Sequence, residues 1–188
     1  MTPRVAIVHP WLVAGGGSEA CALWMIRGLQ EDHRVTLLTM GRPDLAALDA
    51  KYGVGLDRDR VEVRGLALPP GTRTRFDALR AFPLARCARR RRGEFDVMIS
   101  AYNAMDFGTP GIQRIADFAF DEALRRELDP AEGAIAASSP LHRASPARAA
   151  YLGLARLLAG DRRDAWRRNR TLANSEWTAA VLRDTAAG

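Results

Sequence analysis

Apolar runs and segments of helical periodicity alternate along the chain. Val5 to Val8 is an unbroken apolar run, which predicts a strand buried on both faces of a sheet. Residues 18–30 are apolar at most positions, which predicts a helix packed between other elements, and the aliphatic and β-branched residues of 33–39 predict a second strand. Strand, helix and strand in this order are typical of a βαβ unit with parallel strands.

The same patterns continue through the rest of the chain. Alternation at 60–64 and apolar character at 95–100, 111–116 and 171–175 predict further strands. Helices are predicted at 43–48, 74–90, 121–128, 146–168 and 176–183, and we expect Pro83 to kink or interrupt the second of them. The chain is therefore predicted to be α/β, a single Rossmann-like domain with a mainly parallel, doubly wound sheet. Ligands of such folds bind at the carboxyl ends of the strands.

Composition narrows the class of protein. The 188 residues are 47% hydrophobic and 27% charged, as in a folded globular protein, and the net charge is +6. Lys51 is the only lysine, so the basic character is almost entirely arginine; it favours phosphate-bearing ligands or anionic lipid. Cys21 and Cys87 are too few for a disulfide framework and lack metal-site spacing, which predicts free thiols, no metal and a cytoplasmic location.

A run of three glycines follows the first predicted strand. Gly15, Gly16 and Gly17 precede Ser18, a predicted helix N-cap, and Glu19, an acid in the first turn. A helix N-terminus exposes backbone N–H groups and attracts anions such as phosphate. The glycines also satisfy the dinucleotide pattern G-x-G-x-x-G/A, but residues 10–14 separate them from the strand, and the second strand ends without an acid that would hold a ribose. A sugar-phosphate loop, a dinucleotide loop and a simple tight turn remain alternatives.

Four stretches resemble one family when they are taken together. They are Val5-Ala-Ile-Val-His-Pro10 followed by Gly16-Gly-Ser-Glu19; Asp32-His-Arg-Val-Thr36, similar to "G-H-x-V-T"; Phe95-Asp-Val-Met-Ile-Ser100, similar to "D-V-V-I-S"; and Ala173-Asn-Ser-Glu-Trp-Thr178, similar to "A-N-S-x-x-T". In this order they resemble the retaining glycosyltransferases with two Rossmann-like domains, the GT-B type known as group 1 or family 4.

The resemblance implies an architecture and a reaction. Residues 1–188 would be the N-terminal, acceptor-side half of a GT-B enzyme that moves a sugar from a nucleotide-sugar donor to a hydroxyl acceptor with retention. No metal or other cofactor is implied. The C-terminal donor-binding domain, with its "E-x7-E" pair, is absent from this sequence, so we expect little transferase activity from these residues alone.

The resemblance also implies roles for individual residues. Gly15, Gly16 and Gly17, with Ser18 and Glu19, would meet the donor sugar and its diphosphate; the alternative for Glu19 is only a favourable charge in a first helical turn.

Many family members carry a histidine after the fifth strand. Here that position reads Ala116, and Asp117 beside it is the candidate catalytic residue. Asp117 could orient a sugar hydroxyl or accept a proton, or it could be a capping or salt-bridged residue.

Polar residues after two other strands are candidates for the acceptor. His9 ends the first predicted strand, and Tyr102, Asn103 and Asp106 follow the fourth. A lone histidine is more often structural, which is the alternative for His9.

The basic helix at 74–92 could lie on an anionic membrane, at the inner face, or it could present an ordinary solvated face. Arginines also cluster at 162–170, but no helix-turn-helix, zinc or stacking motif accompanies them, so nucleic acid is not an expected partner. Two other function classes stay open: a non-catalytic sugar- or membrane-binding module, and a Rossmann dinucleotide-binding oxidoreductase.

Overall fold

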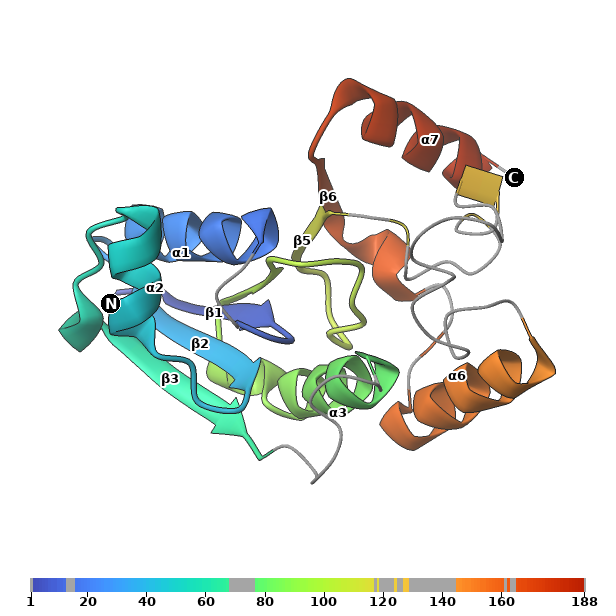
Figure 1. Ribbon diagram of the computed structural model, residues 1–188, viewed down its shortest axis with the longest axis horizontal. Coiled ribbons are helices and arrows are strands. Elements are labelled where there is room, and N and C mark those ends of the chain that lie inside the picture. The colour runs from blue at the N-terminus through green and yellow to red at the C-terminus, as the bar shows by residue number, and fades with distance from the viewer. Residues whose placement is uncertain are drawn as a thin grey trace.

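A computed structural model describes residues 2–12, 16–67, 77–116, 118, 124, 127–128, 145–160, 162 and 165–187, in which strands and helices alternate (Figure 1). The strands are β1 (Arg4–His9), β2 (Arg34–Met40), β3 (Val61–Leu66), β4 (Val97–Ser100), β5 (Ile112–Ile115) and β6 (Arg170–Ala173). The helices are α1 (Gly17–Leu29), α2 (Leu45–Tyr52), α3 (Asp77–Arg90), α6 (Pro146–Ala159) and α7 (Glu176–Ala187), and short 3-10 turns occupy Arg58–Arg60, Arg92–Glu94 and Ala165–Arg168.

These six strands form one sheet in the order β3-β2-β1-β4-β5-β6, and every neighbouring pair is parallel. The chain therefore runs outward from β1 in one direction and from β4 in the other. The predicted doubly wound α/β, Rossmann-like domain is confirmed. In such sheets the ligand crevice lies beyond the carboxyl ends of the two strands where the order reverses, which here are β1 and β4.

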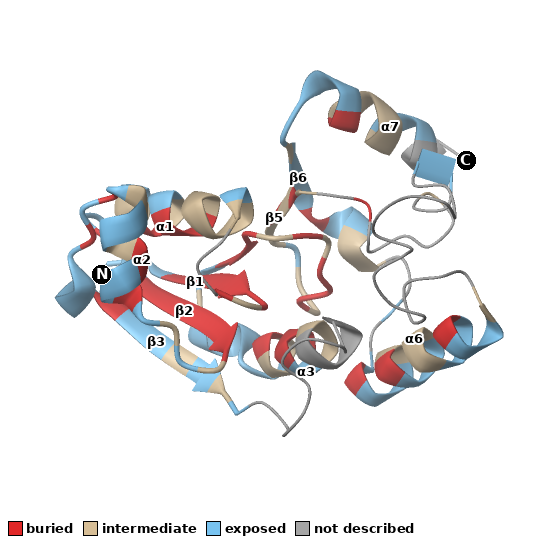
Figure 2. Ribbon diagram, viewed as in Figure 1, coloured by how far each residue is buried: buried red, intermediate tan, exposed pale blue. Residues whose placement is uncertain are grey.

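Two apolar cores sandwich the sheet, because successive residues of a strand point to opposite faces. Val5 and Ile7 of β1 belong to the core with α1 and α2, whereas Ala6 and Val8 belong to the core with α3. Figure 2 shows the resulting pattern, with β1 and β2 buried at the centre of the molecule and the outer faces of the helices exposed. The continuous apolar run in β1 is thus explained by helices on both of its faces.

Two predicted helix boundaries are wrong. The helix predicted at 146–168 ends at Ala159, because Gly160 takes a left-handed conformation (φ 65°) and its N–H bonds to the carbonyls of Arg156 and Leu157. At the other boundary, Gly16 and not Ser18 is the N-cap of α1. Elsewhere α3 continues through Pro83 as one helix, and most of the helix predicted at 121–128 lies outside the described residues. Among the residues that are described, no helix has the length and apolar character needed to cross a bilayer.

Candidate functional site

The N-terminus of α1 opens at the carboxyl edge of β1. Gly16 precedes the helix in extended conformation, and no side chain caps the first turn. Instead, the Tyr52 hydroxyl donates to the Gly16 carbonyl at 3.0 Å, and the Ser18 hydroxyl donates to Glu19 Oε2 at 2.9 Å. Within the described part of the chain, no side chain is therefore recorded as capping the N–H groups that begin the helix, and these groups can bind water or a ligand. Gly15 lies outside the described residues.

Glu19 closes against the glycine loop. A Cβ built on Gly16 would lie 2.8 Å from Glu19 Oε2, so the carboxylate occupies the space that any other residue at position 16 would need. A Cβ on Gly17 would meet nothing within 4 Å. A larger residue at position 16 would therefore displace the Glu19 carboxylate, whereas Gly17 faces open space. Contact of these residues with a donor sugar or diphosphate stays a prediction.

His9 ends β1 with its side chain buried, at 1% exposure. The Trp11 N–H donates to its Nδ1 at 3.3 Å, and the ring meets Tyr102 edge to face with centroids 5.5 Å apart. Its Nε2 is buried and has no hydrogen-bond partner among the described residues. Burial, opposed by Glu19 and reinforced by Arg114, lowers the pKa of His9 to about 4, so the ring is neutral at pH 7.

Arg114 is a polar residue at this edge that the sequence reasoning missed. It is the third residue of β5, is half-buried, and leaves Nη1 buried without a partner in the described part of the chain. It is one of the two charged groups that act on His9, the other being Glu19. The two polar residues in the middle of this short strand, Gln113 and Arg114, could have pointed to a functional role. Only the sheet register shows that Arg114 lies on the same face of the sheet as His9.

Tyr102 and Asn103, two of the predicted acceptor-binding residues in the loop after β4, accept hydrogen bonds from within the protein. Asn103 is 7% exposed, and its Oδ1 accepts the Ala116 N–H at 3.1 Å, while the Tyr102 carbonyl accepts the same N–H at 3.2 Å. The Ser100 hydroxyl donates to the Asn103 carbonyl at 2.5 Å. These bonds fold the loop back over the end of β5. A contact of Tyr102 or Asn103 with an acceptor stays a prediction.

Asp106 is held in a buried ion-pair network. Its side chain is 2% exposed and accepts from Arg89 at 2.8 Å, from Arg168 at 2.7 Å and from the Gly108 N–H at 2.8 Å. Burial acts to raise the pKa of this carboxyl, but the Gly108 N–H and the two arginines outweigh it and hold the pKa below its usual range. The arrangement gives Asp106 a structural role, and its predicted contact with an acceptor remains untested.

Arg89 extends this network to another helix. Its guanidinium also donates to the carbonyls of Ala159 and Gly160 at 2.5 Å, where α6 ends. A cation is favourable at a helix C-terminus, so one arginine of the predicted basic helix joins α3, α6 and the loop after β4.

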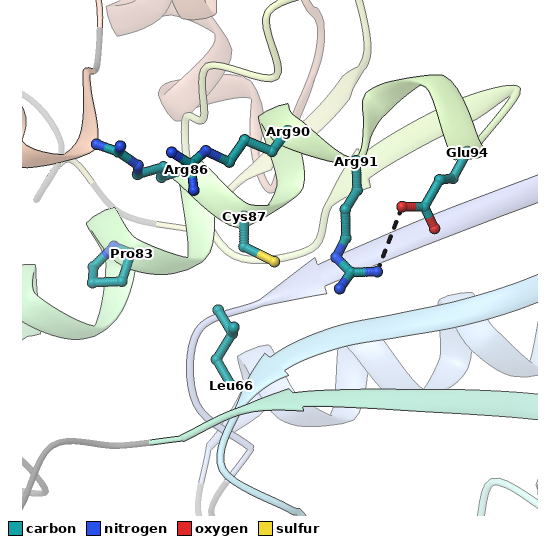
Figure 3. A pocket seen from close by; sticks show the side chains of 7 residues that line it. All are labelled: Leu66, Pro83, Arg86, Cys87, Arg90, Arg91 and Glu94. Atoms are coloured by element: carbon teal, nitrogen blue, oxygen red, sulfur yellow. Dashed lines mark hydrogen bonds and ion pairs between the residues drawn. The ribbon is translucent and has the colours of Figure 1, made fainter.

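A cleft of about 550 Å³ lies on the other side of the sheet, between α3 and the end of β3. Figure 3 shows the Cys87 sulfur directed toward Leu66 and Arg91 paired with Glu94; the other lining residues are Pro83, Arg86 and Arg90. None of the predicted site residues lines this cleft. We therefore place the candidate site at the carboxyl edge of β1, β4 and β5, where His9, Arg114, Glu19 and the start of α1 gather.

Asp117, the predicted catalytic residue, lies outside the described residues. In the parts of the chain that are described, no three histidine, cysteine or acidic side chains come together in a way that could hold a metal ion.

Comparison with known proteins finds similar solved structures, of which two are described here. No protein-family model matches the chain, and no curated protein sequence matches it. Crystal structures of HepE from Anabaena, one in complex with UDP and glucose and one in complex with UDP, resemble it at 13% sequence identity with TM-scores of 0.39 and 0.38. Each match covers 98% of this chain and 50% of the HepE chain, so the chain spans about half the length of that protein. A likeness of this size assigns no function, which must be argued from the residues themselves.

Proposed function

We propose that this chain is the acceptor-side half of a GT-B glycosyltransferase that transfers a sugar from a nucleotide-sugar donor to a hydroxyl acceptor with retention. The observation that carries the proposal is the uncapped N-terminus of α1 at the strand-order reversal, next to the buried His9. The family-like motifs support it, because three of the four end at this edge of the sheet: at the glycine loop after β1, at Ser100 of β4 and at Asn174 after β6.

The last of these motifs contacts the end of β5. The Asn174 side chain donates to the Ala116 carbonyl at 3.2 Å and accepts the Thr178 hydroxyl at 2.6 Å, and Ser175 caps α7 by accepting the Thr178 N–H at 3.1 Å. The "A-N-S-x-x-T" residues thus tie the segment that carries Asp117 to α7.

The chemistry divides between backbone and side chains. Backbone N–H groups at Gly17 and Ser18 would meet the diphosphate of the donor, where the positive end of the α1 dipole stabilises negative charge as the leaving group departs. Glu19 would accept hydroxyls of the transferred sugar, and Asp117 would orient the acceptor hydroxyl or take its proton. The second Rossmann-like domain implied by the resemblance would bind the nucleotide, so transfer requires both halves, and no metal is invoked.

The proposal is tested by removing one N–H group. Gly17 is the first residue of α1, where proline is well tolerated, and Gly16 before it is already extended (ψ 171°), as a residue before proline must be. Gly17→Pro therefore deletes a donor with little change in fold, and Gly17→Ala is the matched control that retains it. We expect UDP-glucose, chosen because the similar structures hold UDP and glucose, to bind Gly17→Pro about 10-fold more weakly than Gly17→Ala, the loss of one charge-assisted bond.

Isothermal titration of the chain, alone and joined to a second Rossmann-like domain of the kind that the proposal requires, measures this difference. Equal affinities of the two variants, or tight binding of NAD in place of nucleotide sugars, contradict the proposal; tight NAD binding supports the oxidoreductase alternative. Nucleotide-sugar binding without any transfer by the longer protein favours a non-catalytic module.

A peripheral contact with an anionic membrane is a second proposal about partners. The outer face of α6 exposes Leu154, Leu157 and Leu158 at 57%, 76% and 58%, and α6 packs beside the arginine-rich end of α3. Exposed leucines beside an exposed cation such as Arg90 favour the surface of an anionic bilayer. We expect flotation with vesicles containing phosphatidylglycerol, reduced in Leu157→Gln and in Arg90→Ser, whereas Arg89 must be kept because it pairs with Asp106. Protein that stays unbound at low salt contradicts this contact.

A further inference from the structure

Two buried donors at the candidate site have no partner. Among the described residues, four side chains leave a buried nitrogen or oxygen atom unpaired: His9, Gln30, Thr39 and Arg114. His9 and Arg114 are the two that lie at the ends of β1 and β5 and act on each other electrostatically. A buried N–H without a partner is costly, and each such group in a folded protein calls for an explanation.

The sheet register places the two side chains on one face. Ile7, Ile99 and Ile112 are paired across β1, β4 and β5; the first two belong to the core beneath α1, and Ile112 packs against it. Two residues further along each segment are His9, Ala101 and Arg114, which therefore share that face. Ala101 is buried in the same core.

The residue between His9 and Arg114 is small. The backbones of β1 and β5 are two strand spacings apart, about 9.5 Å, and Ala101 between them has only a methyl group. Ala101 is itself fully buried in the core beneath α1. The edge beyond these residues is the one at which α1 begins, so a group that contacts both side chains must enter from that edge.

Both side chains carry hydrogen-bond donors at that edge. His9 accepts the Trp11 N–H through Nδ1, so the proton of the neutral ring is on Nε2, and Arg114 has only donors. The acid that also acts on His9 is Glu19, whose Oε2 already accepts the Ser18 hydroxyl and lies against Gly16. Two donors with one positive charge match an oxyanion better than a neutral hydroxyl.

We propose that Arg114 and His9 bind an acid group of the acceptor, a phosphate or a carboxylate, at the carboxyl edge of β1 and β5. The assignment of this group to the acceptor rests on the proposed function, in which the donor diphosphate binds at the start of α1. Arg114 is then a specificity-determining residue that selects charged over neutral sugars as acceptors.

The test compares charged and neutral sugars on three proteins. Binding of glucose 6-phosphate, glucuronate and glucose is measured by NMR titration of wild type, Arg114→Gln and Arg58→Gln. Arg58 is the matched control, since it is exposed and leads into the amino end of β3, at the opposite edge of the sheet. We expect wild type and Arg58→Gln to prefer a charged sugar over glucose by about 10-fold or more, and Arg114→Gln to lose that preference.

Fold and donor binding are followed separately. Arg114→Gln removes a half-buried guanidinium whose Nη1 has no partner among the described residues, so its thermal midpoint without ligand is expected to be equal to or above that of wild type. Its affinity for UDP-glucose is expected to be unchanged. The inference is overturned if wild type shows no preference for charged sugars, if Arg114→Gln retains it, or if that variant instead weakens UDP-glucose, which would assign Arg114 to the donor. Absence of UDP-glucose binding by every protein, each also tested when joined to a second Rossmann-like domain, with the charged-sugar preference intact, refutes the proposed function but not the anion site.

Discussion

Asp106→Asn is expected to lower the free energy of unfolding by about 3 kcal/mol, because it leaves two arginines without their shared carboxylate. The Arg89 side chain is 17% exposed and that of Arg168 is 35% exposed. Removing one partner of a buried ion pair costs about 3–5 kcal/mol, and the partial exposure of Arg168 places the expectation at the lower end. The loss also releases the end of α6, which Arg89 holds through backbone carbonyls. Urea unfolding followed by circular dichroism measures the change.

Asp96→Asn is the matched control for this variant. Asp96 also pairs with an arginine, Arg4, but the two side chains are 50% and 48% exposed. An exposed pair contributes about 0–1 kcal/mol, so the same change of charge should have a small effect there. If the two variants lose equal stability, the Asp106 network does not hold the loop after β4 to α3 and α6.

Acidification is expected to destabilise the protein through His9. Its pKa is lowered from 6.5 to about 4 in the folded state, so between these values the unfolded chain binds the additional proton. Stability is therefore greatest above pH 6.5 and falls as the pH decreases toward 4, by about 3 kcal/mol in all. The charged groups that act on this ring are Glu19, which favours its protonation, and Arg114, which opposes it; burial outweighs both.

The measurement is a difference between variants, which cancels the titration of the carboxylates. His9→Asn retains an acceptor for the Trp11 N–H but cannot be protonated, so its loss of stability between pH 7 and pH 4 should be about 3 kcal/mol smaller than that of wild type. His33→Asn is the control, because His33 precedes β2 at the opposite edge of the sheet. The expectation fails if wild type and His9→Asn lose stability in parallel.

Most of the fold could be predicted from the sequence, because local patterns carry it. A continuous apolar run predicted β1, aliphatic and β-branched residues predicted β2, and apolar character predicted β4. The alternation of these strands with helical segments predicted a parallel sheet. The two errors in helix boundaries occurred at glycines, where the capping and hydrophobic patterns placed the helix end at another residue. At Gly16 the uncapped start of α1 depends on Tyr52 and Glu19, and at Gly160 a left-handed residue ends α6 before the apolar pattern does.

The candidate site could be predicted in place but not in its contacts. A strand followed by glycines marks the carboxyl edge of β1, and His9 was identified there. Asn103 and Asp106 are indistinguishable in sequence from ligand-binding residues, yet they bind Ala116 and two distant arginines. Arg114 was missed because the sequence of its strand does not show that its side chain lies on the same face of the sheet as His9.

The sequence by itself therefore determined the elements, their parallel arrangement and the edge at which polar residues gather. Hydrophobic periodicity and backbone chemistry depend on residues that are close together in the sequence, so they can be recognised without the tertiary structure. Only the tertiary structure decided which polar groups are already paired and which are left free. Pairing and burial depend on partners brought together by the register of the sheet, such as Asp106 with Arg168, 62 residues apart, and His9 with Arg114 across β4.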